Sequence, residues 1–148
     1  MKACLILGPK SVTWYKDGYP LLKNKELFIG HHGRLEDEGI WLEDKNGIPA
    51  KVLCLWYTTL TVKDYDKPFV LTKSCESQEY KVYDNYNAIE IKRIGDIPYD
   101  YDGPMGVPTS FFKYQNELED YEVLEKRGDL VLNGEQMFQR LIIRRKQL

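Results

Sequence analysis

Residues 3–30 decide the fold at the start of the chain, and they read ACLILGPKSVTWYKDGYPLLKNKELFIG. The apolar run that ends at Gly8 is typical of a strand buried on both faces. Residues 12–24 follow Ser11, a common N-cap residue, and repeat apolar side chains about one helical turn apart. Residues 26–30 form a second apolar run. The order of strand, helix and strand predicts a βαβ unit with parallel strands, the edge of a parallel sheet.

The rest of the chain predicts strands and hairpins. Residues 52–57 give the strongest strand signal, and Asn-Gly pairs at 46–47 and 133–134 separate apolar runs. Such pairs favour type I′ turns, because both central residues need a positive φ. We therefore expect a strand-rich α/β to α+β fold with mostly antiparallel strands after the βαβ unit. Residues 1–148 are expected to form a single domain or domain fragment, with the βαβ unit in 1–33 and a β-rich region in 34–148.

Composition fits an ordinary globular protein. The chain has 148 residues, of which 43% are hydrophobic and 30% charged, and its net charge of −2 gives no overall basic field. No apolar run approaches the roughly 18 residues of a membrane span. The run at residues 3–7 is too short for a secretory signal. We expect a cytoplasmic protein without a membrane partner.

Charge is distributed unevenly along the chain. Residues 76–125 contain four basic and twelve acidic side chains, whereas residues 126–148 contain six basic and two acidic ones. The C-terminal hairpin is therefore predicted to be a basic ribbon. Such a ribbon can contact phosphates and enter a DNA groove. Basic side chains also protect an exposed edge strand from aggregation, and the sequence leaves both interpretations open.

A loop rich in proline and glycine lies at residues 95–108 and contains Asp96, Asp100 and Asp102. Several carboxylates close in sequence are what a hard cation prefers, but the spacing matches no EF-hand. The alternative is a rigid loop whose carboxylates accept hydrogen bonds from neighbouring amides. A metal-dependent enzyme that uses Asp100 and Asp102 is the most distant interpretation.

Histidine and cysteine add no clear site. His31 and His32 follow the second apolar run and are interpreted as a polar turn. Cys4, Cys54 and Cys75 form neither a disulfide framework nor a zinc pair. The sequence also contains no Gly-x-Gly-x-x-Gly, no Walker-type phosphate loop and no Gly-x-Ser-x-Gly elbow.

One block of the sequence is similar to a known family. Residues 83–90 read YDNYNAIE, residues 97–103 read IPYDYDG and residues 105–108 read MGVP. Together they resemble the YDNYDAI and IPYDYDGxMGVP block of the EcoRI-type adenine-specific DNA methyltransferases. Further similarity to that family lies in residues 5–30, 55–60 and 133–144.

The resemblance implies a function. Members of this family transfer a methyl group from S-adenosylmethionine to adenine N6 in DNA. The sequence contains no Asn-Pro-Pro-aromatic motif, so the resemblance implies the C-terminal, target-recognition part, with residues 34–148 as the region that helps to read DNA. We carry over no catalytic or cofactor-binding residue and expect S-adenosylmethionine only with a missing N-terminal part. The expected partners are DNA, bound weakly by this chain alone, and a separately encoded N-terminal half.

A methyltransferase that flips a base also needs a surface that holds the duplex. We expect that surface at the basic hairpin and the tyrosine-rich loop. The alternative is a stand-alone interaction domain without enzymatic activity, whose aromatic side chains form a homodimer or partner interface. The DNA-binding candidates are Arg140, Arg144, Arg145, Lys146, Tyr99 and Tyr101, and the motif loop comprises Asp100, Asp102, Gly103, Met105, Gly106 and Pro108.

Overall fold

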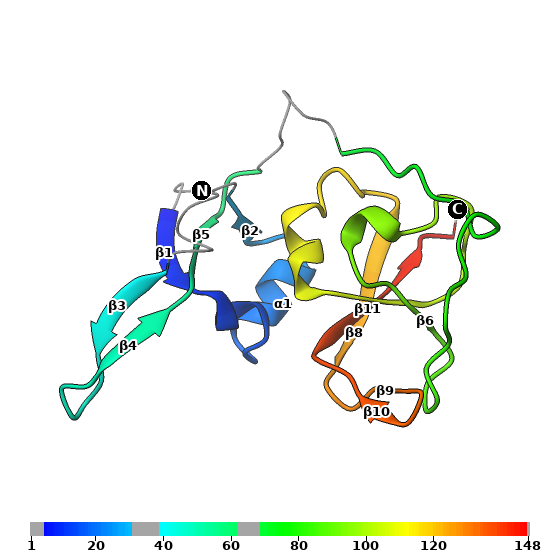
Figure 1. Ribbon diagram of the computed structural model, residues 1–148. Coiled ribbons are helices and arrows are strands. Elements are labelled where there is room, and N and C mark those ends of the chain that lie inside the picture. Colours follow the sequence, from blue (N-terminus) through cyan, green and yellow to red (C-terminus); the bar gives the residue numbers. More distant parts are fainter. Residues whose placement is uncertain (1–4, 31–38, 62–68, 148) are drawn as a thin grey trace. The chain divides into compact units, whose positions relative to one another are not determined.

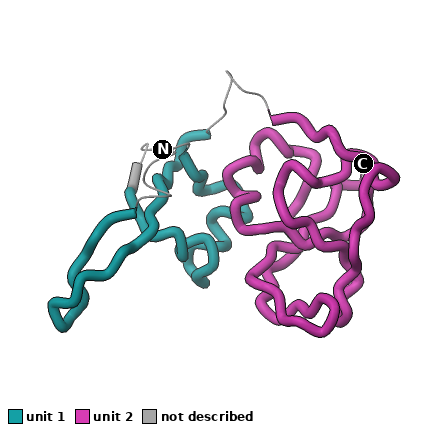
Figure 2. Tube along the Cα trace, viewed as in Figure 1, with its two compact units in different colours: residues 1–64 teal, residues 65–148 magenta. Residues whose placement is uncertain are grey.

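The computed structural model describes residues 5–30, 39–61 and 69–147. The chain forms two compact units, residues 1–64 and 65–148 (Figure 2). The sheet of the first unit includes a strand from residues 54–58, beyond the βαβ unit expected in residues 1–33. Cys4 and the His31-His32 pair lie outside the described residues.

The first unit contains a three-stranded sheet in the order β1-β5-β2. β1 (Leu5–Pro9) and β2 (Phe28–Ile29) each pair antiparallel with β5 (Cys54–Thr58). The strand–helix–strand order is as predicted, and β1 and β2 run in the same direction. They do not pair with each other, however, because the apolar β5 lies between them and supplies the hydrogen bonds of both.

The predicted helix at residues 12–24 is divided into two short pieces. A 3-10 turn, η1, covers Lys10–Thr13, and the helix α1 covers Gly18–Lys23. Pro20 has no backbone N–H, and a proline is tolerated only in the first turn of a helix. Gly18 is required where α1 begins, because a Cβ there would collide with the backbone oxygen of Val12. The helix therefore starts late and stays short.

A hairpin of β3 (Ile40–Glu43) and β4 (Pro49–Val52) extends from the same unit (Figure 1). Its turn is not the predicted type I′, because only Gly47 has a positive φ, of 74°. The side chain of Asp44 accepts hydrogen bonds from the amides of Asn46 and Ile48, at 2.7 and 2.9 Å. This arrangement gives a longer turn that is closed by a left-handed glycine.

The second unit contains a four-stranded sheet in the order β6-β7-β11-β8 (Figure 1). β6 and β7 are parallel, whereas β11 pairs antiparallel with both β7 and β8. Two 3-10 turns, η2 and η3, follow β6 and β7, and a small hairpin joins β8 to β11. The bounds are Ile89–Glu90 (β6), Ile94–Asp96 (η2), Met105–Val107 (β7), Thr109–Lys113 (η3), Tyr121–Arg127 (β8), Val131–Leu132 (β9), Glu135–Gln136 (β10) and Arg140–Arg145 (β11).

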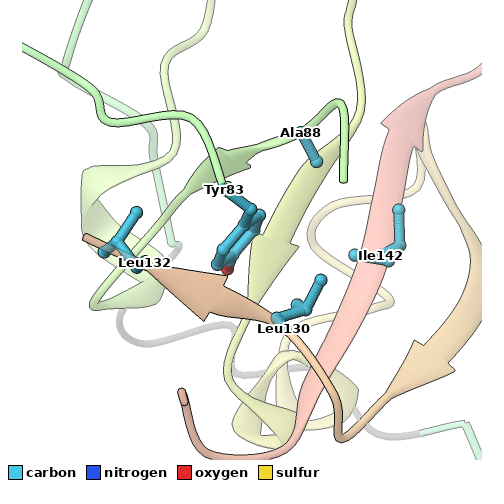
Figure 3. Close-up of a cluster of buried hydrophobic side chains, with 5 residues drawn as sticks. All are labelled: Tyr83, Ala88, Leu130, Leu132 and Ile142. Atoms are coloured by element: carbon cyan, nitrogen blue, oxygen red, sulfur yellow. The ribbon is translucent and has the colours of Figure 1, made fainter. Parts of the chain in front are cut away.

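Both faces of this sheet are buried. Along β11, Leu141, Ile142 and Ile143 are all fully buried although successive side chains point to opposite faces. Ile142 belongs to a cluster in which the Tyr83 ring lies among four aliphatic side chains (Figure 3). The cluster comprises Tyr83, Ala88, Leu130, Leu132 and Ile142.

The observed architecture confirms the strand-rich α/β to α+β prediction, with antiparallel and mixed sheets and few helical turns. The Asn133-Gly134 pair forms the predicted type I′ turn, with φ values of 52° and 80°. Across the described ranges, no helix has the length and apolar character needed to cross a membrane.

Candidate nucleic-acid interface

The block that carries the family resemblance forms the parallel connection of the second unit. It runs from Tyr83 through β6, around the loop at residues 97–104 and into β7. The loop is anchored to the strands, because the amide of Ile89 donates to the carbonyl of Pro104 at 3.2 Å and the amide of Tyr99 donates to that of Lys73 at 2.9 Å. The block therefore determines where the ends of β6 and β7 lie.

Asp84 and Asn85 hold the small hairpin. The carboxylate of Asp84 accepts hydrogen bonds from the amides of Gly134 and Asn133, at 2.8 and 3.2 Å. The side chain of Asn85 accepts from the amide of Val131 at 2.9 Å and donates to the carbonyl of Asp129 at 2.7 Å. This part of the resemblance block thus has a structural role at the type I′ turn.

Arg140 lies in a buried ion pair. Its guanidinium Nη2 donates to Oε1 of Glu90 at 2.8 Å, and the side chains are 11% and 2% exposed. The hydroxyl of Tyr83 donates to the other oxygen of Glu90. Burial, followed by the hydrogen bond to Glu90, raises the pKa of Tyr83. Burial lowers the pKa of Arg140, but the hydrogen bonds to Glu90, the charge of Glu90 and the contribution of Tyr83 together outweigh this effect, and the resulting pKa is raised.

The other candidates in the basic ribbon lie closer to solvent, and both arginines have carboxylate partners. Arg144 pairs with Glu122 at 3.0 Å, and Arg145 pairs with Asp102 at 3.1 Å. Arg145 also donates to the carbonyl of Tyr99 and stacks over the ring of Tyr121, 5.5 Å from its centroid. The side chain of Lys146 is exposed. The basic ribbon thus has less free positive charge than its sequence suggests. Exposed ion pairs are weak, however, so a competing anion can replace the carboxylate.

The motif loop is also largely engaged within the fold. Asp100 accepts a hydrogen bond from the amide of Cys75 at 2.6 Å. A Cβ at Gly103 would collide with the ring of Tyr101, and one at Gly106 would collide with the ring of Tyr83. Both glycines are needed for close approach of a tyrosine. The structure therefore brings Tyr99, Asp102 and Arg145 together, keeps Met105 in the core, and places Pro108 directly after β7.

A groove that the sequence analysis missed lies where β6 and β7 end. The carboxyl ends of parallel strands meet at one edge of a sheet, which is where α/β proteins place their ligands. The residues after β6 and the residues of η3 after β7 lie next to each other there (Figure 1). The groove has a volume of about 430 Å³. Its lining comprises Phe69, Lys92, Arg93, Ile94, Gly95, Pro108, Ser110, Lys113 and Tyr114.

The signal for this groove in the sequence is the position of a few basic side chains, not the regional charge. Residues 76–125 contain only four basic side chains, and three of them, Lys92, Arg93 and Lys113, line it. None of the lining residues is acidic. The regional charge of the acidic middle segment therefore concealed a local basic cluster.

Two features of the described residues bear on a metal ion and on S-adenosylmethionine. Within these residues, no three histidine, cysteine or carboxylate side chains gather as a metal site would require. β1 ends with Gly8-Pro9 and is followed directly by the η1 turn rather than by a glycine-rich loop that could approach a cofactor. We therefore derive no chemical step through either group.

Comparison with known proteins defines the class of this protein. The family described as "Adenine-specific methyltransferase EcoRI" matches residues 1–145. The chain therefore belongs to the EcoRI family of adenine-specific methyltransferases, as its sequence motifs suggested. No solved structure matches the chain.

Three curated relatives are type II methyltransferases. M.EcoRI of Escherichia coli is 34% identical over 168 residues, which cover 99% of this chain and 51% of that protein. M.MgeORF184P of Mycoplasma genitalium is 31% identical over a region that covers 63% of this chain and 36% of that protein. M.MpnI of Mycoplasma pneumoniae is 28% identical over a region that covers 84% of this chain and 44% of that protein. The chain thus spans about half the length of M.EcoRI and less of the other two.

Proposed function

We propose that this chain is the DNA-contacting, target-recognition part of an adenine-N6 DNA methyltransferase of a restriction–modification type. The S-adenosylmethionine site and the catalytic loop lie outside residues 1–148, and these residues alone do not transfer methyl groups. It binds DNA weakly through cationic side chains of the second unit. Because the substrate is DNA, we also propose a cytoplasmic location.

The observation that carries this proposal is the family match over residues 1–145 in a chain without the Asn-Pro-Pro-aromatic motif. The family match indicates the class of reaction. The absence of the motif indicates that residues 1–148 do not contain the catalytic loop. The pairs of Arg144 with Glu122 and of Arg145 with Asp102 lie near the surface, so both arginines can exchange a carboxylate for a phosphate. Arg140 is proposed to support the ribbon from within rather than to contact DNA.

The test is reconstitution. The chain is mixed with a polypeptide that carries the S-adenosylmethionine and catalytic motifs of an EcoRI-type enzyme, and transfer of labelled methyl groups to adenine in duplex DNA is measured. We expect no transfer by the chain alone, and transfer with retention of DNA when both parts are present. Neither a complex nor transfer in the mixture would contradict the proposal.

A second candidate function rests on the β3–β4 hairpin. Trp41, Leu42 and Ile48 are 67%, 52% and 59% exposed there, although large apolar side chains are normally covered. This surface favours a stand-alone interaction domain that binds a protein partner or a second copy of the chain. Sedimentation equilibrium separates the two functions: a stable dimer that the Trp41→Ser substitution dissociates supports the second candidate.

A further inference from the structure

The groove at the ends of β6 and β7 combines two features that nucleic-acid sites need. Lys92 and Arg93 approach it from the segment after β6, and Lys113 approaches it from η3. Three cations and no acidic side chain among the lining residues give a local positive field within an acidic region. Its charge is therefore complementary to a phosphate backbone.

Arg93 is positioned to remain available. The side chain of Arg93 is 82% exposed, and its Nε lies 3.1 Å from Oδ2 of Asp96. Asp96 is buried and does not itself line the groove, so the exposed part of the pair is the Arg93 side chain. The outer side of the Arg93 guanidinium can therefore contact a phosphate without breaking a buried network.

An aromatic pair forms another part of the lining. The rings of Phe69 and Tyr114 lie 4.5 Å apart between centroids, with an interplanar angle of 37°. Both rings are only partly buried and both line the groove. A partly exposed ring beside cations provides a platform on which an unpaired base can stack. A paired base inside a duplex has no free face to offer.

We propose that this groove binds an unpaired stretch of DNA, with phosphates on Lys92, Arg93 and Lys113 and a base stacked on the Phe69–Tyr114 pair. The inference rests on the proposed function, because a methyltransferase that flips its target base leaves that base and its former partner unpaired. It adds a defined site for those nucleotides, separate from the basic ribbon. The groove contacts the phosphates of the DNA and the face of one base, so its binding does not depend on the DNA sequence.

The experiment measures binding of the full chain to fluorescein-labelled oligonucleotides by anisotropy at low salt. The probes are a 12-nucleotide single strand, the same backbone with abasic positions, and a duplex. We expect the base-bearing strand to bind about tenfold more tightly than the abasic strand, the effect of one stacked base. Equal affinity for the two single strands would overturn the proposal.

Variants assign the effect to the groove. Tyr114→Leu should remove the preference for bases and leave binding of the abasic strand unchanged, whereas Lys92→Gln with Arg93→Gln should weaken binding of both strands. The matched controls are Tyr15→Leu and Lys16→Gln with Lys45→Gln, which change exposed side chains of the first unit. Groove variants that bind like the parent chain would overturn the proposal.

A crosslinking measurement does not depend on the folding of any variant. A single strand that contains one 5-iodouracil is irradiated with the parent chain, and the modified peptide is identified by mass spectrometry. We expect modification at Phe69 or Tyr114, and modification only elsewhere would overturn the site. If the chain binds duplex DNA while the single-strand results are negative, this inference fails and the proposed function survives. If no probe binds and reconstitution gives no transfer, both fail.

Discussion

Arg140 on β11 and Glu90 on β6 form a buried ion pair across β7, although fifty positions separate them in the sequence. Gly106 of β7 lies opposite Glu90 on one side and opposite Ile142, two positions from Arg140, on the other. A Cβ at Gly106 would collide with the ring of Tyr83. Tyr83 covers the same glycine and donates to Glu90. The pair therefore links β6 to β11 across β7, and Tyr83 links it to the start of the resemblance block.

Removing one member of this pair should destabilise the second unit strongly. Glu90→Ala leaves the Arg140 guanidinium buried without a partner, which typically costs about 3–5 kcal/mol. The double variant Glu90→Leu with Arg140→Met should recover most of this loss, because a buried ion pair can be replaced by apolar side chains at little cost. Hydrogen exchange of peptides from residues 83–91 and 140–145 during urea unfolding measures both effects.

Tryptophan fluorescence provides an internal control for that experiment. Trp14, Trp41 and Trp56 all lie in the first unit. Their fluorescence thus follows unit 1, while exchange in the two peptides follows unit 2. A Glu90→Ala chain whose peptides exchange like those of the parent would contradict the assigned role of the pair.

Tyr83 should make the second unit sensitive to alkali. Burial, and then the hydrogen bond to Glu90, raises the pKa of Tyr83 above its ordinary value. The folded state therefore holds the proton at pH values where the unfolded chain, with a tyrosine pKa near 10, releases it. The stabilisation is fully present below about pH 10 and decreases by up to about 1.4 kcal/mol per pH unit above it.

The measurement compares urea midpoints of the parent chain and Tyr83→Phe from pH 8 to 11. Tyr83→Phe should be less stable at pH 8, because Glu90 loses a donor, and should lose stability less steeply above pH 10. Tyr80, Tyr86, Tyr101 and Tyr121 also have raised pKa values and contribute the same slope to both chains. Parallel curves above pH 10 would refute the role of Tyr83.

The sequence predicted those elements whose signals are local. The Asn133-Gly134 turn and the apolar strand β5 appear where periodicity and turn chemistry placed them. The pairing of β1 and β2 with β5 was not predictable, because β5 comes 25 positions after β2 in the chain. Choosing between a direct parallel pair and an inserted antiparallel strand depends on tertiary contacts that no local pattern encodes.

The candidate site shows the same limit. The partners of the ribbon arginines lie far away in sequence, so the ribbon appeared more basic than the folded surface is. The groove could not be predicted from the sequence, because there the folded surface is more basic than the surrounding sequence suggests. Its cations at 92, 93 and 113 are too few to affect the charge of an acidic region, and only the parallel strands bring them together.

The bonds of Asp84 to the small hairpin give a third prediction. Asp84→Ala removes the acceptor for the amides of Asn133 and Gly134, and we expect a loss of about 1–3 kcal/mol. The effect should be local, with faster hydrogen exchange in residues 130–137. Asp129→Ala is the matched control, because that carboxylate pairs with Arg127 on the exposed surface. Equal exchange in the two variants would show that Asp84 does not hold the turn.

The salt dependence of binding gives the last prediction and counts the phosphate contacts in the groove. Each phosphate neutralised on a single strand contributes about −0.7 to the slope of log K against log salt concentration. Three contacts, by Lys92, Arg93 and Lys113, therefore predict a slope near −2 for the 12-nucleotide strand. Lys92→Gln should reduce the magnitude of the slope by about 0.7. Tyr114→Leu should lower the affinity for the strand and leave the slope unchanged, because stacking releases no counterions. Anisotropy titrations between 25 and 200 mM salt measure the slopes, and a Lys92→Gln slope equal to that of the parent would exclude a phosphate contact at this side chain.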